Sequence, residues 1–364
     1  MLKKFTASKL FSVSLRMIKS IFNSIFLLSI LISSCNGQNK NAEGQSATAK
    51  IIGSTVQQID KSIWVIFQDK KNNYWFGSNG TGVYCWDGKI IKQYTDKDGL
   101  IENRIRGIQE DKSGNIFFDT PIGVSKFDGE KFVSLSPVKS MMSQWKLQED
   151  ELWFKGNGDV LGAYRYDGET LHHLEFSDID SLEHDITHGV YTIYKDKQSN
   201  IWFGTLSKGV CRFDGESLKW IYEKELSVLD DGRVPAVRSI LEDNEGFFRF
   251  SNIISKYKIS TSKTKTDLVY EKLPAIDLSK QKSKMVLPYY TSAVMDKENL
   301  WMTNYNEGVW NYNGEDLTNY IVMDGEVKVL PVSIYKDNSG GIWVATDNAG
   351  VYKYNGSEFV KFGK

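Results

Sequence analysis

The sequence predicts an all-β protein, a single seven-bladed β-propeller of four-stranded antiparallel blades, and three observations lead to this fold. A phrase of the type Trp-Phe-Gly-Thr, followed by Gly-Val and then by Asp-Gly or Asn-Gly, recurs along the chain. Its copies begin about 45 residues apart, which is the length of one four-stranded blade. Aromatic residues make up 13% of the chain, and aromatic side chains pack well on pleated strands. The anchoring aromatic residues of the seven copies are Trp75, Phe117, Trp153, Trp202, Phe248, Trp301 and Trp343.

Each repeat is expected to form one blade, with its strands in a fixed order. An inner strand such as residues 237–242 leads into a tight turn from Asp243 to Gly246. In such a turn Asp can bond its own backbone and Gly can adopt a positive φ. The Trp-Phe strand and the Gly-Val-Tyr strand follow. An Asp-Gly or Asn-Gly pair then makes the hairpin turn to an outer strand such as residues 358–362.

The repeats differ in how well they keep this pattern. The fifth copy, Phe247–Ser251, lacks the later Asp-Gly, and the segment from there to Leu287 is rich in Lys, Ser and Thr. The last repeat is complete at the C-terminal end of the sequence. Ring closure is therefore expected without strand exchange, although residues 51–60 could add a strand.

Over nearly all of residues 60–362 the repeats resemble the two-component regulator propeller repeat. The resemblance lies in four motifs that follow one another: Ile-x-x-Asp, Ile-Trp-Phe-Gly-Thr, Gly-Val and Phe-Asp-Gly. In that family such propellers commonly form periplasmic sensor regions of hybrid histidine kinases, some of which respond to carbohydrates. Those sensors usually also contain a second propeller, a further β-domain, a membrane span and a kinase. The resemblance therefore implies a fold and a style of ligand binding rather than signalling by this chain itself.

The N-terminal segment predicts export and a lipid anchor. Residues 1–34 read as a lipoprotein signal peptide, because basic residues without any acid precede an apolar run at residues 21–32. The run ends in Ile-Ser-Ser and Cys35, which resembles a bacterial lipobox and implies cleavage before Cys35 and lipidation of its sulfur. An ordinary signal peptide with an incidental cysteine is the alternative, and Met17 is an alternative start.

Three segments with different roles follow from this interpretation. The signal peptide occupies residues 1–34, the lipidated Cys and a flexible polar tether occupy residues 35–50, and the propeller occupies residues 51–364. The expected location is the cell envelope, at the outer membrane or facing the periplasm. The membrane is reached through the lipid alone, and the domain is expected to be monomeric.

The charge balance excludes one class of partner. The whole chain has 45 basic and 46 acidic residues, and residues 1–35 contain five of the basic residues and none of the acidic ones. The remainder therefore has 40 basic against 46 acidic residues, a net charge of −6. Nucleic-acid binding needs clustered positive charge, so it is not expected.

One position of the inner strand is expected to face the central channel near its mouth. It lies five residues before each turn Asp and holds Trp64, Arg106, Trp145, Tyr191, Arg238, Thr291 and Val332. The first five are the candidate ligand-binding residues, because aromatic rings and Arg donors can hold a sugar or an anionic ligand. The alternative is that these side chains pack between blades. Neighbouring loops contain Asn79, Asn157, Asn252, Asn304 and Asn348, which are either ligand contacts or turn formers.

The four histidines are confined to one segment between the third and fourth repeats. His184 and His188, spaced by three residues among carboxylates, could bind a divalent metal, but an exposed acidic loop is the preferred interpretation. No metal site and no other cofactor are therefore predicted. Cys85 and Cys211 occupy matching positions in distant repeats, so free thiols are expected rather than a disulfide.

These features favour a non-catalytic propeller that binds a small molecule, a carbohydrate or an envelope protein on its channel face. The sequence contains no nucleophile elbow, phosphate-cradling loop or HExxH motif. One alternative is a metal-dependent lyase resembling virginiamycin B lyase, which uses His, Glu and a metal on its channel face. The other is an envelope protein-interaction scaffold. No catalytic residue is predicted.

Overall fold

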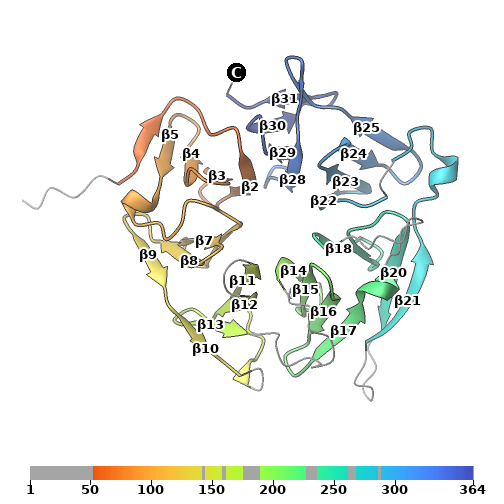
Figure 1. Cartoon of the computed structure of the whole chain (residues 1–364), viewed down its shortest axis with the longest axis horizontal. Helices are drawn as coiled ribbons and strands as arrows, with labels where there is room; N and C mark the ends of the chain where they lie inside the picture. Colours follow the sequence, from red (N-terminus) through yellow and green to blue (C-terminus); the bar gives the residue numbers. More distant parts are fainter. Residues whose placement is uncertain are drawn as a thin grey trace, which may run out of the picture. The chain divides into compact units, whose positions relative to one another are not determined.

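Seven β-sheets stand as blades around a common axis and confirm the predicted seven-bladed propeller (Figure 1). The computed structural model describes residues 52–141, 144–157, 161–174, 189–226, 236–260, 268–285 and 288–363. Helical structure within these residues is limited to short segments such as α2 (Glu223–Leu226). No helix of the described residues is long and apolar enough to cross a membrane.

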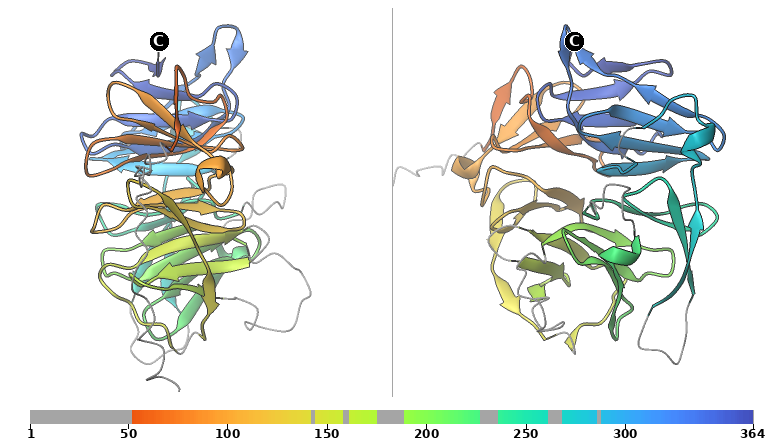
Figure 2. Two further views of the ribbon diagram at one scale, coloured as in Figure 1. Left: turned by 90° about the vertical axis from the view of Figure 1, so that its left-hand side faces the viewer. Right: turned by 45° about the vertical axis from the view of Figure 1, so that its right-hand side comes forward.

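Five of the blades follow the expected order, in which four consecutive strands run from the channel outwards (Figures 1 and 2). Blade two consists of β6 (Gly107–Glu110), β7 (Ile116–Thr120), β8 (Gly123–Phe127) and β9 (Phe132–Leu135). Blade four consists of β14 (Val190–Lys195), β15 (Ile201–Thr205), β16 (Gly209–Phe213) and β17 (Leu218–Tyr222). Blade five consists of β18 (Ile240–Glu242), β19 (Phe248–Phe250), β20 (Ser255–Ser260) and β21 (Val269–Pro274).

The last two blades keep the same order. Blade six consists of β22 (Ser292–Asp296), β23 (Asn299–Asn304), β24 (Gly308–Tyr312) and β25 (Leu317–Tyr320). Blade seven consists of β28 (Pro331–Lys336), β29 (Ile342–Thr346), β30 (Val351–Tyr354) and β31 (Phe359–Lys361). A small hairpin of β26 (Met323–Asp324) and β27 (Val327–Lys328) connects them.

Blade one has a fifth strand. Its four regular strands are β2 (Ile63–Gln68), β3 (Tyr74–Ser78), β4 (Val83–Trp86) and β5 (Ile91–Tyr94). The strand β1 (Ser54–Val56) pairs antiparallel with β5 at the outer edge. The added strand lies within the segment where the sequence left room for one.

Blade three has no inner strand among its described residues. Its innermost strand is β11 (Leu152–Asn157), followed outwards by β12 (Leu161–Tyr166) and β13 (Leu171–Leu174). The fourth strand is β10 (Pro137–Lys139), which lies outermost and pairs parallel with β13. The segment Pro137–Lys139 therefore strengthens the outer edge of this blade.

In three blades a buried aspartate in the turn between the first two strands bonds both the turn backbone and the indole N–H of the following Trp-Phe strand. Asp337 accepts hydrogen bonds from the backbone N–H groups of Ser339 and Gly341, and its Oδ2 accepts the indole N–H of Trp343 at 2.8 Å. The same carboxylate-to-indole bond joins Asp69 to Trp75 and Asp196 to Trp202. This bond fixes the register between the turn and the Trp-Phe strand.

The aromatic residues of the repeats fill the space between neighbouring blades. Trp202 of blade four lies against Phe248 of blade five with ring centroids 4.7 Å apart, and Trp301 lies 4.9 Å from Tyr354 of blade seven. Buried aromatic area of this kind is a major source of folding free energy. The core of the molecule is therefore a ring of seams between blades.

The ring closes between blades one and seven without strand exchange. The amide N–H of Gly350 donates to the carbonyl of Lys61 at 2.7 Å, and the Tyr74 hydroxyl donates to Asp337 at 2.8 Å. Phe362, just after the last strand, lies 5.2 Å from Phe76 of blade one. Side-chain and loop contacts thus hold the first and last blades together.

We expect Asp337→Asn to lower the free energy of unfolding by about 2–3 kcal/mol, because several hydrogen bonds to a charged group are weakened. Burial opposes ionisation of Asp337, but bonds from Ser339, Trp343 and Tyr74 hold its pKa well below the usual range. As the pH falls, the unfolded chain binds the proton first, so this stabilisation is present above about pH 4 and declines below it. Urea denaturation at pH 7 and pH 3 measures both effects.

The control for this prediction is Asp87→Asn, in an exposed hairpin turn where the carboxylate accepts only the backbone N–H groups of Lys89 and Ile90. This variant should lose clearly less stability. Equal losses in the two variants would contradict a special role for the buried carboxylate.

Candidate ligand site in the central channel

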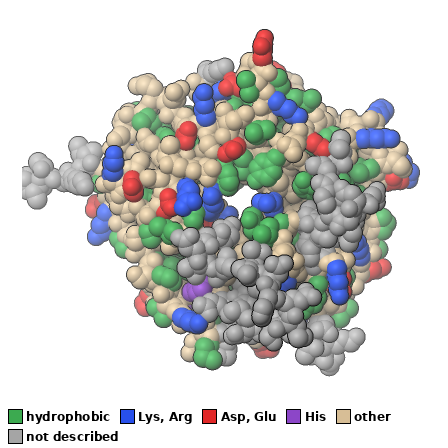
Figure 3. All heavy atoms as spheres, viewed as in Figure 1, with side chains coloured by type: hydrophobic (Ala, Val, Ile, Leu, Met, Phe, Trp, Pro, Cys, Tyr) green, Lys and Arg blue, Asp and Glu red, His purple; other side chains and the backbone are tan. Residues whose placement is uncertain are grey.

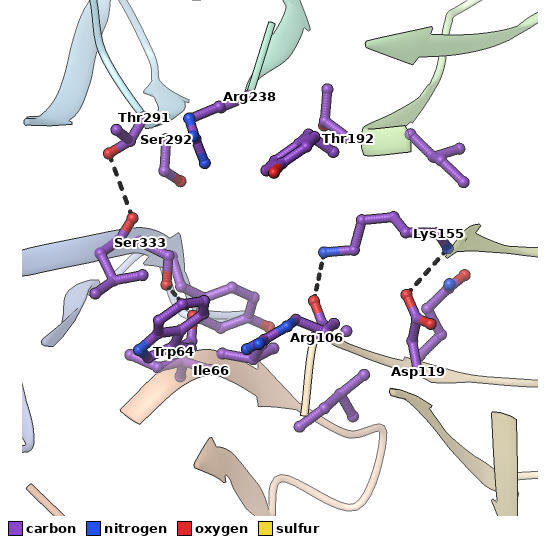
Figure 4. A pocket seen from close by; sticks show the side chains of 18 of the residues that line it. Trp64, Ile66, Arg106, Asp119, Lys155, Thr192, Arg238, Thr291, Ser292 and Ser333 are labelled. Atoms are coloured by element: carbon purple, nitrogen blue, oxygen red, sulfur yellow. Dashed lines mark hydrogen bonds between the residues drawn. The ribbon is translucent and has the colours of Figure 1, made fainter. Parts of the chain in front are cut away.

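The central channel widens into a cavity of about 680 Å³ that residues from all seven blades line. Four basic side chains and two acidic ones lie on its described wall: Arg106, Lys155, Lys195, Arg238, Asp119 and Glu151. On the face drawn in Figure 3, Lys and Arg side chains stand beside the central opening next to hydrophobic ones. Figure 4 shows the polar side chains reaching into the cavity from several blades.

Trp64 and Arg106 form the first arginine–aromatic pair of the cavity. The Arg106 guanidinium lies over the Trp64 ring, 4.3 Å from its centroid, and its Nη1 donates to Asn79 Oδ1 at 2.9 Å. The Trp64 indole N–H donates to Asp347 at 2.7 Å, which fixes the ring. Burial lowers the pKa of Arg106, and the neighbouring charge of Arg104 lowers it further.

Tyr191 and Arg238 form the second pair, from blades four and five. The Arg238 guanidinium lies 4.6 Å from the centroid of the Tyr191 ring. Among the described residues this guanidinium has no hydrogen bond and no ion pair. A planar group of N–H donors therefore lines the cavity without an acceptor among the described residues.

Tyr305 also lines this cavity and was not predicted from the sequence. It follows Asn304, which is the last residue of β23 and one of the candidate loop asparagines. Burial raises the pKa of Tyr305, the positive charges of Arg238 and Arg106 lower it, and the negative charge of Asp347 raises it. Its hydroxyl thus lies within the electrostatic reach of both arginine–aromatic pairs.

Blade three contributes Lys155, and blade two contributes Asp119. The Lys155 ammonium donates to the backbone carbonyl of Arg106, and the Lys155 backbone N–H donates to Asp119 Oδ2 at 3.0 Å. Burial raises the pKa of Asp119 to about 7, against the opposing charges of Lys155 and Arg106. Burial also lowers the pKa of Lys155. These groups meet the channel because β11 has no inner strand in front of it.

The prediction that Trp145 faces the channel is wrong. Its side chain is 2% exposed and packs between blades three and four, 5.1 Å from the ring of Trp153 and 6.3 Å from that of Phe213. The prediction assumed an inner strand that blade three does not have among its described residues. The structure brings Trp64, Arg106, Tyr191 and Arg238 to one cavity, together with Thr291 and Val332.

Most of the loop asparagines act in turns. Asn252 accepts the backbone N–H of Ser255, Asn304 donates to the carbonyl of Tyr289, and Asn348 accepts the N–H of Leu330. Asn79 differs, because it holds Arg106 at the cavity. The side chain of Asn157 lies outside the described part of the structure.

The metal candidates His184 and His188 and the lipidation candidate Cys35 lie outside the described residues. Within them, no three His, Cys, Asp or Glu side chains come together as a metal site. His172 bonds Asp167 at 2.6 Å on the outer part of blade three. Cys85 and Cys211 are free thiols.

Comparison with known proteins supports the repeat type. Residues 57–80 and 186–207 match the family model described as two component regulator propeller. A comparison with curated proteins finds no match.

Solved structures with the same fold include proteins of different function. The extracellular domain assigned to a hybrid two component system of B. thetaiotaomicron is 19% identical with a TM-score of 0.57, and the match covers 84% of this chain and 40% of that one. Virginiamycin B lyase from Staphylococcus aureus is 15% identical with a TM-score of 0.56, over 83% of this chain and 97% of the lyase. YCF48 bound to the D1 peptide is 10% identical with a TM-score of 0.53, over 84% and 97%. At these identities the likeness shows the fold.

We expect Trp64→Phe to lower the free energy of unfolding by about 1–2 kcal/mol, because it removes the N–H donor to Asp347 but keeps an aromatic ring under Arg106. Trp64→Ala should lower it further, since the ring that supports the guanidinium is lost as well. Thermal and urea denaturation measure both. Trp86→Phe, on the second-outermost regular strand of blade one, is the control and should change stability less. A Trp64→Phe variant as stable as the native protein would show that the bond to Asp347 contributes nothing.

Proposed function

We propose that this chain, whose repeats match the two component regulator propeller, is a lipid-anchored extracytoplasmic protein that binds a small anionic ligand in its central channel. The binding is non-catalytic, and a carbohydrate that carries an acidic group is the favoured ligand. The role is sensory, in the sense that occupancy of the channel reports the ligand to a partner in the envelope. The similar extracellular domain from B. thetaiotaomicron and the lipobox-like sequence at Cys35 support this location.

The single observation that carries the proposal is the pair of guanidinium groups held over aromatic rings at one cavity. In each pair, a guanidinium covers one face of the ring at 4.3 or 4.6 Å. That ring face supports the arginine and is not free to stack on a neutral sugar. The groups presented to a ligand are planar N–H donors, which match a carboxylate or a similar oxyanion.

The acids on the cavity wall do not neutralise these arginines. Glu151 is bound to the buried Arg165 at 2.6 Å. Asp347, which is not among the lining residues, accepts from the neutral groups of Trp64 and Ser62 and keeps its own charge, so it offsets at most one of the cavity's cations. Asp119 has its pKa raised to about 7 by burial, so its negative charge is only partly present at neutral pH. The channel therefore carries a positive charge that an anion would compensate.

The lyase alternative has less support. The likeness to virginiamycin B lyase is a likeness of fold, and fold does not decide function. The residues that would hold a metal in that hypothesis, His184 and His188, lie outside the described residues.

We expect Arg238→Ala to weaken glucuronate binding about 10- to 100-fold, the loss typical of hydrogen bonds to a charged group. Isothermal titration calorimetry of the full chain at constant ionic strength measures this, with glucose as the uncharged reference ligand. The matched control is Arg212→Ala, because Arg212 also lies over an aromatic ring, that of Trp202, but does not line the cavity. Glucuronate affinity unchanged by Arg238→Ala, or equal affinity for glucose in the native protein, would overturn the proposed anion site.

A further inference from the structure

The strand β11 of blade three has an edge that faces the channel, and no strand of the described residues pairs with that edge. Side chains of blade two satisfy two of its backbone groups. Gln109 Nε2 donates to the carbonyl of Trp153 at 2.6 Å, and Asp119 Oδ2 accepts the N–H of Lys155 at 3.0 Å. Asp119 and Gln109 thus take the place of the missing inner strand.

Asp119 retains an acceptor that nothing in the described structure uses. Its side chain is 1% exposed, lines the cavity, and has its second oxygen, Oδ1, buried without a hydrogen-bond partner among the described residues. A buried acceptor without a partner is costly, since the group has lost its hydration and gained nothing in exchange. Such a group at a cavity wall is a place where a ligand donor fits.

The nearby cations leave this oxygen unpaired. The Lys155 ammonium donates to the backbone carbonyl of Arg106, and the Arg106 guanidinium donates to Asn79. Figure 4 shows the Lys155 side chain extending from beside Asp119 towards Arg106 along the cavity wall. An acid and two bases therefore share one wall, and no ion pair joins them within the described residues.

The geometry points to a second subsite beside the inner edge of β11, where Asp119 Oδ1 accepts a hydrogen bond from a hydroxyl group of a ligand whose carboxylate lies against Arg106 and Arg238. This inference rests on the proposed function and narrows the ligand class to a hydroxylated carboxylate, such as a sugar acid. Asp119 is then the residue that selects hydroxylated acids over simple ones. No feature of the repeat pattern assigns it this role.

A hydroxyl group fits the subsite better than an ammonium group. The charged and titratable groups that face Asp119 are Lys155 from β11, Arg106 from the start of blade two, and Tyr164 from β12. Two of them are cations and would repel a second ammonium group at short range. A neutral hydroxyl donates to the carboxylate without that repulsion.

The test compares three ligands of similar ring size by calorimetry on the full chain: glucuronate, cyclohexanecarboxylate and glucose. The native protein should prefer glucuronate over cyclohexanecarboxylate by about tenfold, the value of one charge-assisted hydrogen bond. This preference should increase with pH between about 6 and 8, because an ionised carboxylate accepts a hydrogen bond more strongly than a protonated one. Asp119→Asn should reduce the preference and remove its pH dependence.

Two further variants serve as controls for the effect of Asp119→Asn on ligand preference. Asp119→Ala removes both oxygens and should abolish the preference, and the unliganded melting temperature of each variant shows whether it is folded. Glu242→Gln makes the same acid-to-amide change at a buried residue away from the cavity, and it should leave the preference intact.

The outcomes separate the two proposals. If folded Asp119→Asn and Asp119→Ala keep the native preference and its pH dependence, the Asp119 subsite is overturned while the anion site stands. If the native protein binds cyclohexanecarboxylate as tightly as glucuronate, the subsite is likewise overturned. If Arg238→Ala binds every carboxylate as the native protein does, or the native protein binds none, both proposals fail.

Discussion

The bond between a buried aspartate and the indole N–H of a tryptophan six residues later is the constraint on which the ring depends. In the blades of Asp69, Asp196 and Asp337 this bond joins the turn to the strand that follows it. Since the turn is fixed, the inner strand that precedes it is also fixed, and its fifth residue before the Asp reaches the channel. In these three blades the contact that stabilises the blade also positions the inner strand at the channel. In blades two and five, which supply Arg106 and Arg238, the turn carboxylates of Asp111 and Asp243 accept backbone N–H groups of the turn instead, with no indole donor among the described residues. Whether an inner-strand side chain reaches the channel thus depends on its distance along the strand from the turn Asp and not on the type of side chain.

This constraint explains what the sequence could predict and where it could not. Counting back from the turn Asp placed Trp64, Arg106, Tyr191 and Arg238 correctly at one cavity, because their blades have an inner strand or its equivalent leading into the turn. It failed for Trp145, where Asp150 lies only three residues before Trp153 and no such turn forms. The shortened spacing was visible in the sequence and was the signal that the inner strand is absent.

Tyr305 and Asp119 could not be found in the same way, for two different physical reasons. Tyr305 lies in a loop after a strand, where no periodicity constrains the direction of a side chain. Asp119 occupies a strand position that an inner strand of the next blade would normally cover, and it meets the cavity only because blade three lacks that strand. The role of Asp119 thus depends on a neighbouring repeat rather than on its own. An irregular repeat can therefore expose a side chain that a regular neighbouring blade would cover.

Closure of the ring without a shared blade has a consequence for how such a molecule can evolve. Because blades one and seven are each built from a continuous stretch of chain, the junction between the first and the last blade is a contact between two separate sheets, like the other junctions of the ring. A whole repeat could be duplicated, lost or moved with breakpoints in the loops between blades. The hydrogen bonds within each sheet would then stay intact. A worn repeat disturbs only its two neighbours, so the third and fifth copies could diverge while the remaining blades kept the framework. The architecture therefore tolerates sequence changes in one blade without loss of the fold of the other blades.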